Sequence, residues 1–318
     1  MFLLWLVNAV RSGSLFYFSA SNPSIPTGGM MGESKFDVLE KIPDEVKPRT
    51  VRIAFPASAE AVIETLRHAG LVFPVIFKPD LGERGWMVRR IHNPTEVEDY
   101  LRDIRLDFII QECVTLPLEF GVFYVRYPSE KNGRVVSITG KTFLSVVGDG
   151  KHTLAQLVRQ NDRAVLQWEI LKKKYTRDWD EVLPAGHQKE LVSIGNHCLG
   201  TTFLNANHLI TDRLHQSFDA IAKQINGFYF GRFDLRCASV QDLQAGRVKI
   251  VELNGCGAEP SHIYQPGFSL WTALGVLVRH WQAMYRVSVE NHARGVPYLS
   301  FQEGRRIYAR FKAAQRDR

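Results

Sequence analysis

Closely spaced cysteines are missing from this chain of 318 residues, which holds four: Cys113, Cys198, Cys237 and Cys256. No two of them form the Cys-x-x-Cys pair that zinc ribbons and thiol redox sites use. We therefore expect reduced thiols, most of them buried, as in a cytoplasmic protein. A disulfide framework and a structural zinc site are not expected.

The sequence also lacks a hydrophobic run long enough to cross a bilayer. A largely apolar segment, residues 1–10, precedes Arg11, whereas a spanning helix needs about 20 apolar residues. It has neither the positive n-region nor the small-residue cleavage site of a secretory signal. We expect a helix that docks on the protein; the alternative is a helix at a membrane surface, in a peripherally associated protein.

Strong positive charge is absent from the body of the chain, although the net charge is +7. Residues 301–318 hold six arginines and lysines against two acids, so this tail contributes +4 and the remainder about +3. The tail shows no base-stacking pattern, and we expect a solvated terminal helix and no nucleic-acid partner. Contact of the tail with anionic lipid or RNA is the alternative.

Internal repeats and low-complexity blocks are missing, and strand and helix patterns alternate along the chain. The patterns predict an α+β fold, with strands concentrated in 73–143 and 229–254. A hairpin is expected within 119–143, and a core helix from 270 to 286 that buries Trp271, Leu274, Leu277, Trp281 and Met284. The other predicted strands are 73–79, 107–113, 229–240 and 247–255; the other predicted helices are 58–70, 94–104, 153–175 and 215–227, with one more starting near Ser34.

A true P-loop is missing as well, although residues 148–153 read Gly-Asp-Gly-Lys-His-Thr. A P-loop needs a glycine five positions before Gly150, where this chain has Ser145. It also needs Ser or Thr directly after the lysine, where this chain has His152. This segment is therefore not expected to bind nucleotide in the P-loop manner.

A different phosphate-binding arrangement is present around Lys78, which ends an apolar strand. Gly82 and Gly85 follow it, and they would let a loop lie close over phosphates while the lysine supplies positive charge. Further on, Glu112 and Glu119 flank a bend between two strands, where a carboxylate can hold ribose hydroxyls. Each feature alone is open to a plainer reading, as a turn or as solvated surface.

Two neighbouring strands near the C-terminal end carry the densest group of polar residues. Alternation places Arg232 and Asp234 on one face of the first strand, and Glu252 and Asn254 on one face of the second. Acid and amide oxygens suit Mg²⁺ or Mn²⁺, and an arginine can neutralise a phosphate in transfer. A surface salt-bridge ladder is the alternative, but it does not explain why the second strand is otherwise apolar.

In this order the pieces resemble the ATP-grasp superfamily, in particular D-alanine–D-alanine ligase and bacterial carboxylate–amine ligases. The resemblance covers residues 47 to 285 and rests on FPVIFKPDLGERGWMV, FIIQECVTLPLEFGVFYV, GRFDLR and ELNGCGAEPSHIYQP. It implies an ATP-grasp fold, in which two α+β subdomains grip ATP between them. The implied domains are an N-terminal segment 1–46, an ATP-grasp domain 47–285 and a basic tail 286–318.

The resemblance also implies roles for single residues. Lys78, Lys141 and Arg232 would contact ATP phosphates beneath the loop of Gly82 and Gly85, with Glu112 and Glu119 on adenosine. Asp234, Glu252 and Asn254 would hold two Mg²⁺ (or Mn²⁺) ions. Ser261 would lie near a substrate carboxylate, so that Arg232 and Ser261 are the expected catalytic residues.

The activity implied is an ATP-dependent carboxylate–amine ligase that works through an acyl phosphate. Its partners would be a small-molecule carboxylate and amine, and the sequence leaves open whether the chain forms a homodimer. The short segment before residue 47 departs from D-alanine–D-alanine ligase, so the resemblance does not name the substrates. A kinase or carboxylate–thiol ligase with the same activation step, or a non-catalytic nucleotide-binding module, is the alternative.

Overall fold

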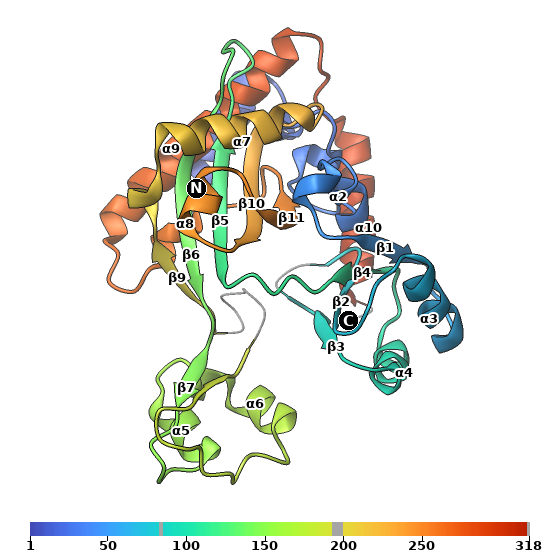
Figure 1. Cartoon of the computed structure of the whole chain (residues 1–318). Helices are drawn as coiled ribbons and strands as arrows, with labels where there is room; N and C mark the ends of the chain where they lie inside the picture. Colours follow the sequence, from blue (N-terminus) through green and yellow to red (C-terminus); the bar gives the residue numbers. More distant parts are fainter. Residues whose placement is uncertain (83–84, 193–199, 317–318) are drawn as a thin grey trace. The chain divides into compact units, whose positions relative to one another are not determined.

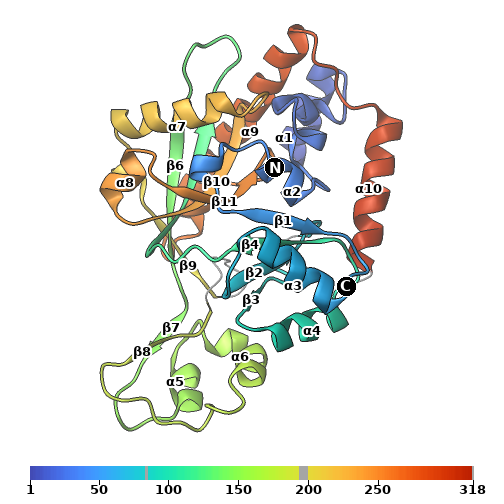
Figure 2. The same cartoon turned by 45° about the vertical axis from the view of Figure 1, so that its right-hand side comes forward.

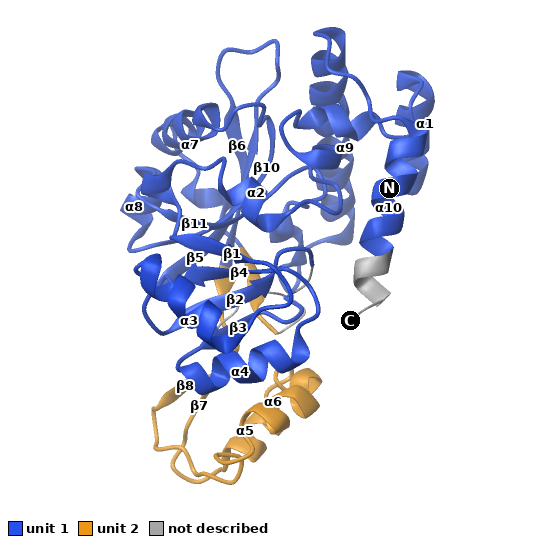
Figure 3. Ribbon diagram, turned by 90° about the vertical axis from the view of Figure 1, so that its right-hand side faces the viewer, with its two compact units in different colours: residues 1–140, 205–318 blue, residues 141–204 orange. Residues whose placement is uncertain are grey.

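The computed structural model describes residues 1–82, 85–192 and 200–316, in two compact units. The first unit joins Met1–Gly140 with Asn205–Arg318, and the second is Lys141–Leu204 (Figure 3). Residues 1–46 therefore fold within the first unit. The strands of this unit come from both of its segments, before residue 141 and after residue 204. The predicted domain boundaries at 47 and 286 stay predictions.

A five-stranded sheet in the order β11-β10-β5-β6-β9 has most of its residues in the first unit (Figure 1). β10 runs antiparallel to both β5 and β11, and the predicted neighbours β5 and β6 lie side by side. The bounds are β5 Leu118–Val125, β6 Arg134–Thr142, β9 Thr202–Asn205, β10 Phe230–Cys237 and β11 Lys249–Asn254.

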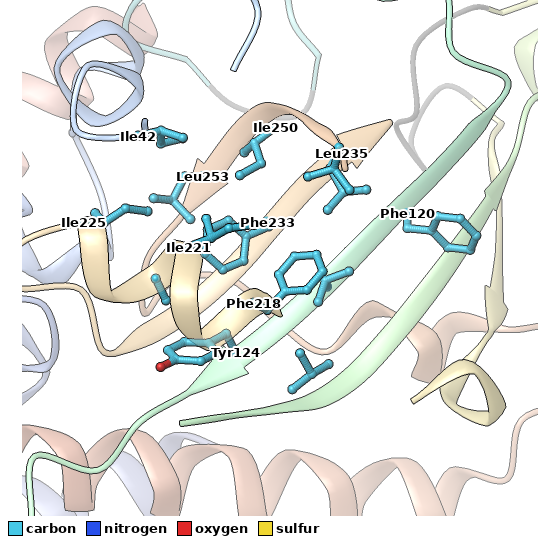
Figure 4. Packing of buried hydrophobic residues seen from close by; sticks show 14 of the residues in the cluster. Ile42, Phe120, Tyr124, Phe218, Ile221, Ile225, Phe233, Leu235, Ile250 and Leu253 are labelled. Carbon is cyan, nitrogen blue, oxygen red and sulfur yellow. The ribbon is translucent and has the colours of Figure 1, made fainter. Parts of the chain in front are cut away.

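One face of this sheet carries the main hydrophobic core (Figure 4). Phe233 and Leu235 of β10 point to this face, where Phe218 and Ile221 of helix α7 (Asp212–Gln224) cover them. The short helix α8 (Val240–Gln244) adds Leu243 to the same core. Because side chains alternate along a strand, the even-numbered residues of β10 face the other way.

The opposite face is covered at one end by helix α9 (Leu270–Ala293). Met284 and Val287 pack there against Phe123 and Phe230 of the sheet. The predicted core helix is thus present and runs longer than expected, but its first half is not core, since Trp271 is 81% exposed. A 3.6-residue period predicts which side of a helix is apolar, not how much of its length a neighbour covers.

Two N-terminal elements pack with α9. Helix α1 (Phe2–Ser12) lies against α9, as the docking prediction requires, and buries Asn8 and Ala9. The 3₁₀ turn Tyr17–Ser21 follows it, and Asn291 of α9 donates a hydrogen bond to the Ala20 carbonyl (2.8 Å). No helix in the described ranges is both long and apolar enough to span a membrane.

A four-stranded antiparallel sheet completes the first unit, in the order β1-β4-β2-β3 (Figure 2). Helices α3 and α4 cover one face, where Tyr100 of α4 packs on Phe77 and Phe108. The bounds are β1 Thr50–Ile53, β2 Val75–Pro79, β3 Arg89–Ile91, β4 Phe108–Glu112, α3 Ala59–His68 and α4 Pro94–Asp103.

The remaining helices of the first unit are α2 (Lys35–Leu39) and α10 (Phe301–Arg316). α2 begins after Ser34, as predicted, and the Ser34 hydroxyl accepts a hydrogen bond from the Asp37 amide (3.1 Å). α10 confirms a helix in the basic tail, and its Arg305 and Arg306 are exposed. Two antiparallel sheets with segregated helices confirm the α+β class.

The second unit has its own core and contradicts one prediction. A continuous helix over 153–175 is wrong, because α5 (Leu154–Gln160) ends at Asn161 and α6 (Trp168–Lys174) starts anew. The Asn161 side chain accepts hydrogen bonds from the amides of Arg163 (3.0 Å) and Ala164 (2.9 Å), which turns the chain. Strands β7 (Ser145–Val147) and β8 (Gln188–Glu190) pair beside these helices.

The three described cysteines are free, as predicted. Cys237 and Cys256 are buried, and burial raises the pKa of the Cys237 thiol to about 11. Cys113 is half-buried, and Cys198 lies outside the described residues.

Candidate functional site

The polar residues of β10 and β11 come together through the strand register. Arg232 lies opposite Asn254, and Asp234 lies opposite Glu252. All four therefore occupy the sheet face that α7 does not cover. Together with Ser261, from the 3₁₀ turn Ser261–Tyr264 that follows β11, we call them the acid cluster.

Arg232 and Asp234 form the centre of the acid cluster. The Arg232 guanidinium donates to both carboxylate oxygens of Asp234, with Nη2 2.9 Å from Oδ2 and Nε 3.2 Å from Oδ1. Asn254 Nδ2 donates to Asp234 Oδ2 as well (2.9 Å), and Arg232 Nη1 donates to the Ser261 hydroxyl (2.9 Å). Asp234 is only 3% exposed. Such a bidentate ion pair fixes the orientation of both side chains.

A glycine on β5 provides space for this ion pair. Gly121 lies opposite Asp234 in the register of β5 and β10. A Cβ atom built there would lie 3.2 Å from both Asp234 Oδ1 and Arg232 Cδ. A side chain at this position would therefore push against the ion pair.

A β-bulge links the acid cluster to the four-stranded sheet. The register shifts between Asp234 and Leu235, which leaves Val251 as the extra residue on β11. The Val251 carbonyl accepts hydrogen bonds from Lys78 Nζ (3.0 Å) and Gln111 Nε2 (3.3 Å). The bulge thus brings the predicted phosphate-binding lysine next to the residue that precedes Glu252.

Lys78 is 7% exposed, and its ammonium also donates to Gln111 Oε1 (3.0 Å). Burial lowers the pKa of Lys78 to about 8, while the Glu252 carboxylate acts in the opposite direction. The group is therefore protonated at neutral pH. Sequence reasoning missed Gln111, although a single polar residue inside the apolar strand FIIQE is a usable signal.

The glycine loop after Lys78 is described only in part. Gly82 accepts a hydrogen bond through its carbonyl from Lys35 Nζ, and Gly85 has a positive φ of 73°, which glycine adopts without strain. Residues 83–84 lie outside the described chain. The cover of this loop over phosphates stays a prediction.

The two glutamates predicted for adenosine have separate arginine partners. Glu112, at the end of β4, accepts from the Arg49 amide (3.2 Å) and lies 3.8 Å from its guanidinium. Glu119, on β5, is buried and lies 3.9 Å from Arg236 Nε. Arg236 follows Arg232 and Asp234 on the same face of β10, so Glu119 lies on the sheet face of the acid cluster.

Lys141, the remaining predicted phosphate ligand, belongs to the second unit. Its ammonium lies 6.0 Å from the centre of the Phe203 ring there. Its role toward ATP stays a prediction.

The chemistry of the donor set fits a magnesium ion that phosphates help to hold. No group of three or more His, Cys, Asp or Glu side chains with a metal-binding arrangement occurs in residues 1–82, 85–192 and 200–316. Mg²⁺ is commonly bound by one or two carboxylates plus substrate phosphates, and Asp234 and Glu252 are such a pair. The Glu252 carboxylate is close enough to both cations of the site to raise the pKa of Lys78 and of Arg232.

The N-terminal segment forms one wall of the site, which sequence reasoning missed. Cys256 and Gly257 donate their amides to the carbonyls of Gly28 (3.0 Å) and Gly29 (2.9 Å). A Cβ atom at Gly255 would lie 2.3 Å from the Gly28 carbonyl oxygen, so only glycine allows this approach. The glycines in both segments were visible in the sequence, but pairing across more than 200 residues leaves no local signal.

Asn22 holds the same segment against β10. Its side chain accepts from the amides of Tyr229 (2.9 Å) and Phe230 (3.0 Å) and donates to the carbonyls of Phe230 (2.7 Å) and Gly28 (2.9 Å). All four hydrogen-bonding positions of this buried amide are thereby used. The segment is therefore an integral part of the first unit at the start of β10.

No protein-family model matches the chain, and no curated protein does. Solved structures do. A bifunctional glutathione synthetase from Pasteurella multocida is 15% identical at a TM-score of 0.38, over 78% of this chain and 36% of that one. The VanG D-Ala:D-Ser ligase from Enterococcus faecalis is 10% identical at a TM-score of 0.46, over 82% of this chain and 62% of that one.

The D-alanine–D-alanine ligase from Bacillus anthracis is 12% identical at a TM-score of 0.46, over 89% of this chain and 71% of that one. The first of these proteins is a synthetase, and the other two are ligases. This chain spans 36% of the length of the glutathione synthetase and 62% of the length of the D-Ala:D-Ser ligase. Identities this low leave the reaction and the substrates of this chain open.

Proposed function

We propose that the protein is an ATP-dependent ligase that joins a small-molecule carboxylate to an amine. The observation that carries the proposal is one connected network: the acid cluster on β10 and β11, joined through the Val251 carbonyl to Lys78. It places cations suited to phosphate next to carboxylates suited to Mg²⁺. ATP with its metal needs both kinds of group at one place.

The phosphates of ATP would be bound by Lys78, Lys141 and Arg232, with the loop of Gly82 and Gly85 over them. Lys78 is protonated at neutral pH, and its burial excludes the water that would weaken its attraction for an anion. The adenosine would lie near Glu112 and Glu119. These assignments follow the order of the motifs along the chain.

The metal ions would be held by Asp234, Glu252 and Asn254, as two Mg²⁺ or Mn²⁺. When bound, they supply charge neutralisation for the phosphates. Asp234 is already oriented by Arg232 and Asn254, so its carboxylate needs little rearrangement. Glu252 is the less constrained of the two acids.

The reaction would proceed in two steps. A carboxylate oxygen of the acid attacks the γ-phosphorus of ATP, the bond to the β-phosphate oxygen breaks, and ADP leaves with an acyl phosphate formed. The amine nitrogen then attacks the acyl carbon, the carbon–oxygen bond to phosphate breaks, and the nitrogen loses a proton. Amide, ADP and phosphate are the products.

Arg232 and Ser261 would act on the acid and on the phosphoryl group in transfer. The guanidinium is fixed by Asp234 on one side and donates to the Ser261 hydroxyl on the other. A cation fixed in this way stabilises the charge that develops in transfer without reorganising. Positioning and charge neutralisation are the main requirements of phosphoryl transfer.

The test is release of ADP and phosphate from Mg²⁺-ATP with D- and L-amino acids, dipeptides and hydroxy acids, offered singly and in pairs. Release that requires one acid and one amine supports the ligase. Release with a single acceptor that keeps the phosphate indicates a kinase, and release that requires a thiol indicates a carboxylate–thiol ligase. ATP binding without release from any pair contradicts the proposal and favours a non-catalytic nucleotide-binding module.

A further inference from the structure

Helix α1 packs on the first unit with its apolar side outward. Its buried residues are Asn8 and Ala9, and the Asn8 amide lies 3.5 Å from the hydroxyl of the buried Tyr17. An ordinary surface helix has the opposite arrangement, with its apolar side on the core. The exposed apolar side chains share one side of the helix, at the spacing that a helix requires: Phe2, Leu3, Leu6, Val7 and Val10.

A similar surface is present on α9, which α1 contacts (Figure 2). Trp281 and Tyr285 follow the exposed residues of α9 on the same side of the helix. There Trp5 of α1 packs on the same hydrophobic cluster, and the Arg11 guanidinium lies 5.0 Å from the centre of the Tyr285 ring. α1 therefore lies beside the second half of this side, while the first half stays exposed. The residues exposed there are Leu270, Trp271, Leu274 and Val278.

We call these exposed residues of α1 and α9 together the apolar face. Monomeric proteins rarely expose so many large apolar side chains on neighbouring elements, and such a surface marks a site of interaction. Both helices also contribute aromatic rings to it, Phe2 and Trp271. Aromatic side chains are enriched where proteins meet the boundary between lipid and water.

The charges on the two helices are of one sign. Residues 1–32 hold Arg11 and no acidic residue, and residues 269–289 hold Arg279 and Arg286 and no acidic residue. Arg11 and Arg279 are exposed. Apolar side chains flanked by arginines suit a membrane with anionic lipids, because the apolar groups enter the acyl region while the arginines meet lipid phosphates.

The basic helix α10 is fastened near the end of α1. The ring of Phe16, four residues after α1, has its centre 6.4 Å from that of Phe301, and a Cβ atom at Gly304 would lie 2.3 Å from the Phe16 ring. Arg305 and Arg306 follow and are exposed. α10 thus brings further positive charge into the same part of the unit.

We propose that the apolar face binds the surface of a membrane that contains anionic lipids. A second copy of this chain is the competing occupant. In a two-fold contact of the face with itself, however, Arg11 and Arg279 would meet arginines, and neither helix segment offers an acid to pair with them. A lipid surface offers phosphates instead. This inference concerns where the protein acts and does not depend on the proposed ligase activity.

The test measures sedimentation of the full chain with vesicles of phosphatidylcholine alone and of phosphatidylcholine mixed with phosphatidylglycerol. The wild type is expected to bind the mixed vesicles at least about tenfold more tightly, and salt should weaken this binding. Leu3→Ser combined with Trp271→Ser should lose about tenfold or more in affinity for the mixed vesicles. The matched control, Val72→Ser combined with Leu166→Ser, replaces similarly exposed apolar residues outside the face and should bind like the wild type.

A second pair of variants tests the charge. Arg279→Gln should weaken binding to the mixed vesicles about fivefold and leave binding to phosphatidylcholine unchanged, because each cation near an anionic surface adds to the attraction. Lys173→Gln, at an exposed lysine of the second unit, removes the same charge elsewhere and should bind like the wild type.

Three results overturn the proposal. The first is a wild type that does not sediment with the mixed vesicles. The second is an equal loss of binding in the control pair Val72→Ser and Leu166→Ser. The third is a wild type that ignores vesicles but forms a dimer in analytical ultracentrifugation, with the dimer lost in Leu3→Ser combined with Trp271→Ser; that result assigns the face to a second copy. Melting temperatures equal to that of the wild type show that no variant acts by unfolding.

Discussion

The acid cluster and Lys78 show opposite arrangements of charge within one unit. In the acid cluster, Arg232, Asp234 and Asn254 bind one another, so that each buried charge already has its partner. Lys78, in contrast, donates in the described part of the chain to two neutral oxygens, the Val251 carbonyl and the Gln111 amide oxygen. The first arrangement pairs its charges within the protein, whereas the second keeps a buried cation among neutral hydrogen-bond acceptors.

This difference separates residues that serve both stability and function from residues that serve function alone. Asp234 is bound by two neighbours and is buried, so its loss disturbs the fold as well as the site. Glu252 lies opposite it and makes no such bond within residues 1–82, 85–192 and 200–316, so its removal should leave the fold intact. Four substitutions test whether stability and function separate in this way.

Glu252→Gln should give the largest effect, a loss of about a hundredfold to a thousandfold in Mg²⁺-dependent ATP turnover, because the amide keeps the shape of the side chain and removes its charge. The unfolding midpoint in urea should stay unchanged. The measurement is ADP release against Mg²⁺ concentration. Glu98→Gln, on the exposed side of α4, is the matched control. Normal turnover in Glu252→Gln would remove this residue from the metal site.

Asp234→Asn should lower the free energy of unfolding by about 3 to 5 kcal/mol, because the guanidinium of Arg232 then lacks its buried counter-charge. Turnover should be lost as well. Urea unfolding measures the first effect and ADP release the second. A variant as stable as the wild type would show that the pair contributes nothing to the fold.

Lys78→Met should remove a pH dependence of stability. The pKa of Lys78 is 10.5 in the unfolded chain and about 8 in the folded one, so the unfolded chain binds more protons between these values. The wild type should therefore gain about 3 kcal/mol of stability as the pH rises through this window. Unfolding midpoints at a series of pH values measure the gain.

The matched control for that series is Lys41→Met, whose lysine is exposed. The control should keep the rise that the wild type shows, and Lys78→Met should lose it. Identical slopes in all three proteins would mean that Lys78 is not buried as a cation. ATP affinity of the wild type should fall over the same window, since deprotonation removes the charge that phosphate binds.

Gly255→Ala should have the smallest effect of the four, a loss of about 1 to 3 kcal/mol, because the new Cβ meets the Gly28 carbonyl and the two loops must separate. ATP turnover should fall because Asn254 precedes this contact. Thermal unfolding measures the loss. Gly275→Ala in α9 is the control, since its Cβ meets nothing closer than 3.6 Å and alanine favours a helix. Equal melting temperatures would contradict the close approach of the loops.

The strands and most helices could be predicted because their signals are local. Alternation along GRFDLR and VELN placed Arg232, Asp234, Glu252 and Asn254 on facing positions, and the register bears this out. Ser34, Pro94 and Ser58 mark helix starts that the structure shows. What could not be read is the bulge at Val251, which depends on pairing with a strand that begins some twenty residues earlier in the chain.

The misses share the same physical cause. The Asn161 turn competes with the helix by a side-chain hydrogen bond that periodicity does not register. Trp271 fits the apolar side of α9, yet it is 81% exposed. The hydrogen bond from Lys35 to the Gly82 carbonyl also leaves no signal in the sequence, because it joins residues 47 positions apart.

The most direct test of the account is to offer hydroxylamine in place of the native amine, with Mg²⁺-ATP and a panel of carboxylic acids. Hydroxylamine attacks acyl phosphates, so the account predicts a hydroxamate with at least one acid, formed in equal amount with ADP and absent in Glu252→Gln. A protein that binds Mg²⁺-ATP but gives neither hydroxamate nor ADP with any acid would contradict carboxylate activation as its function.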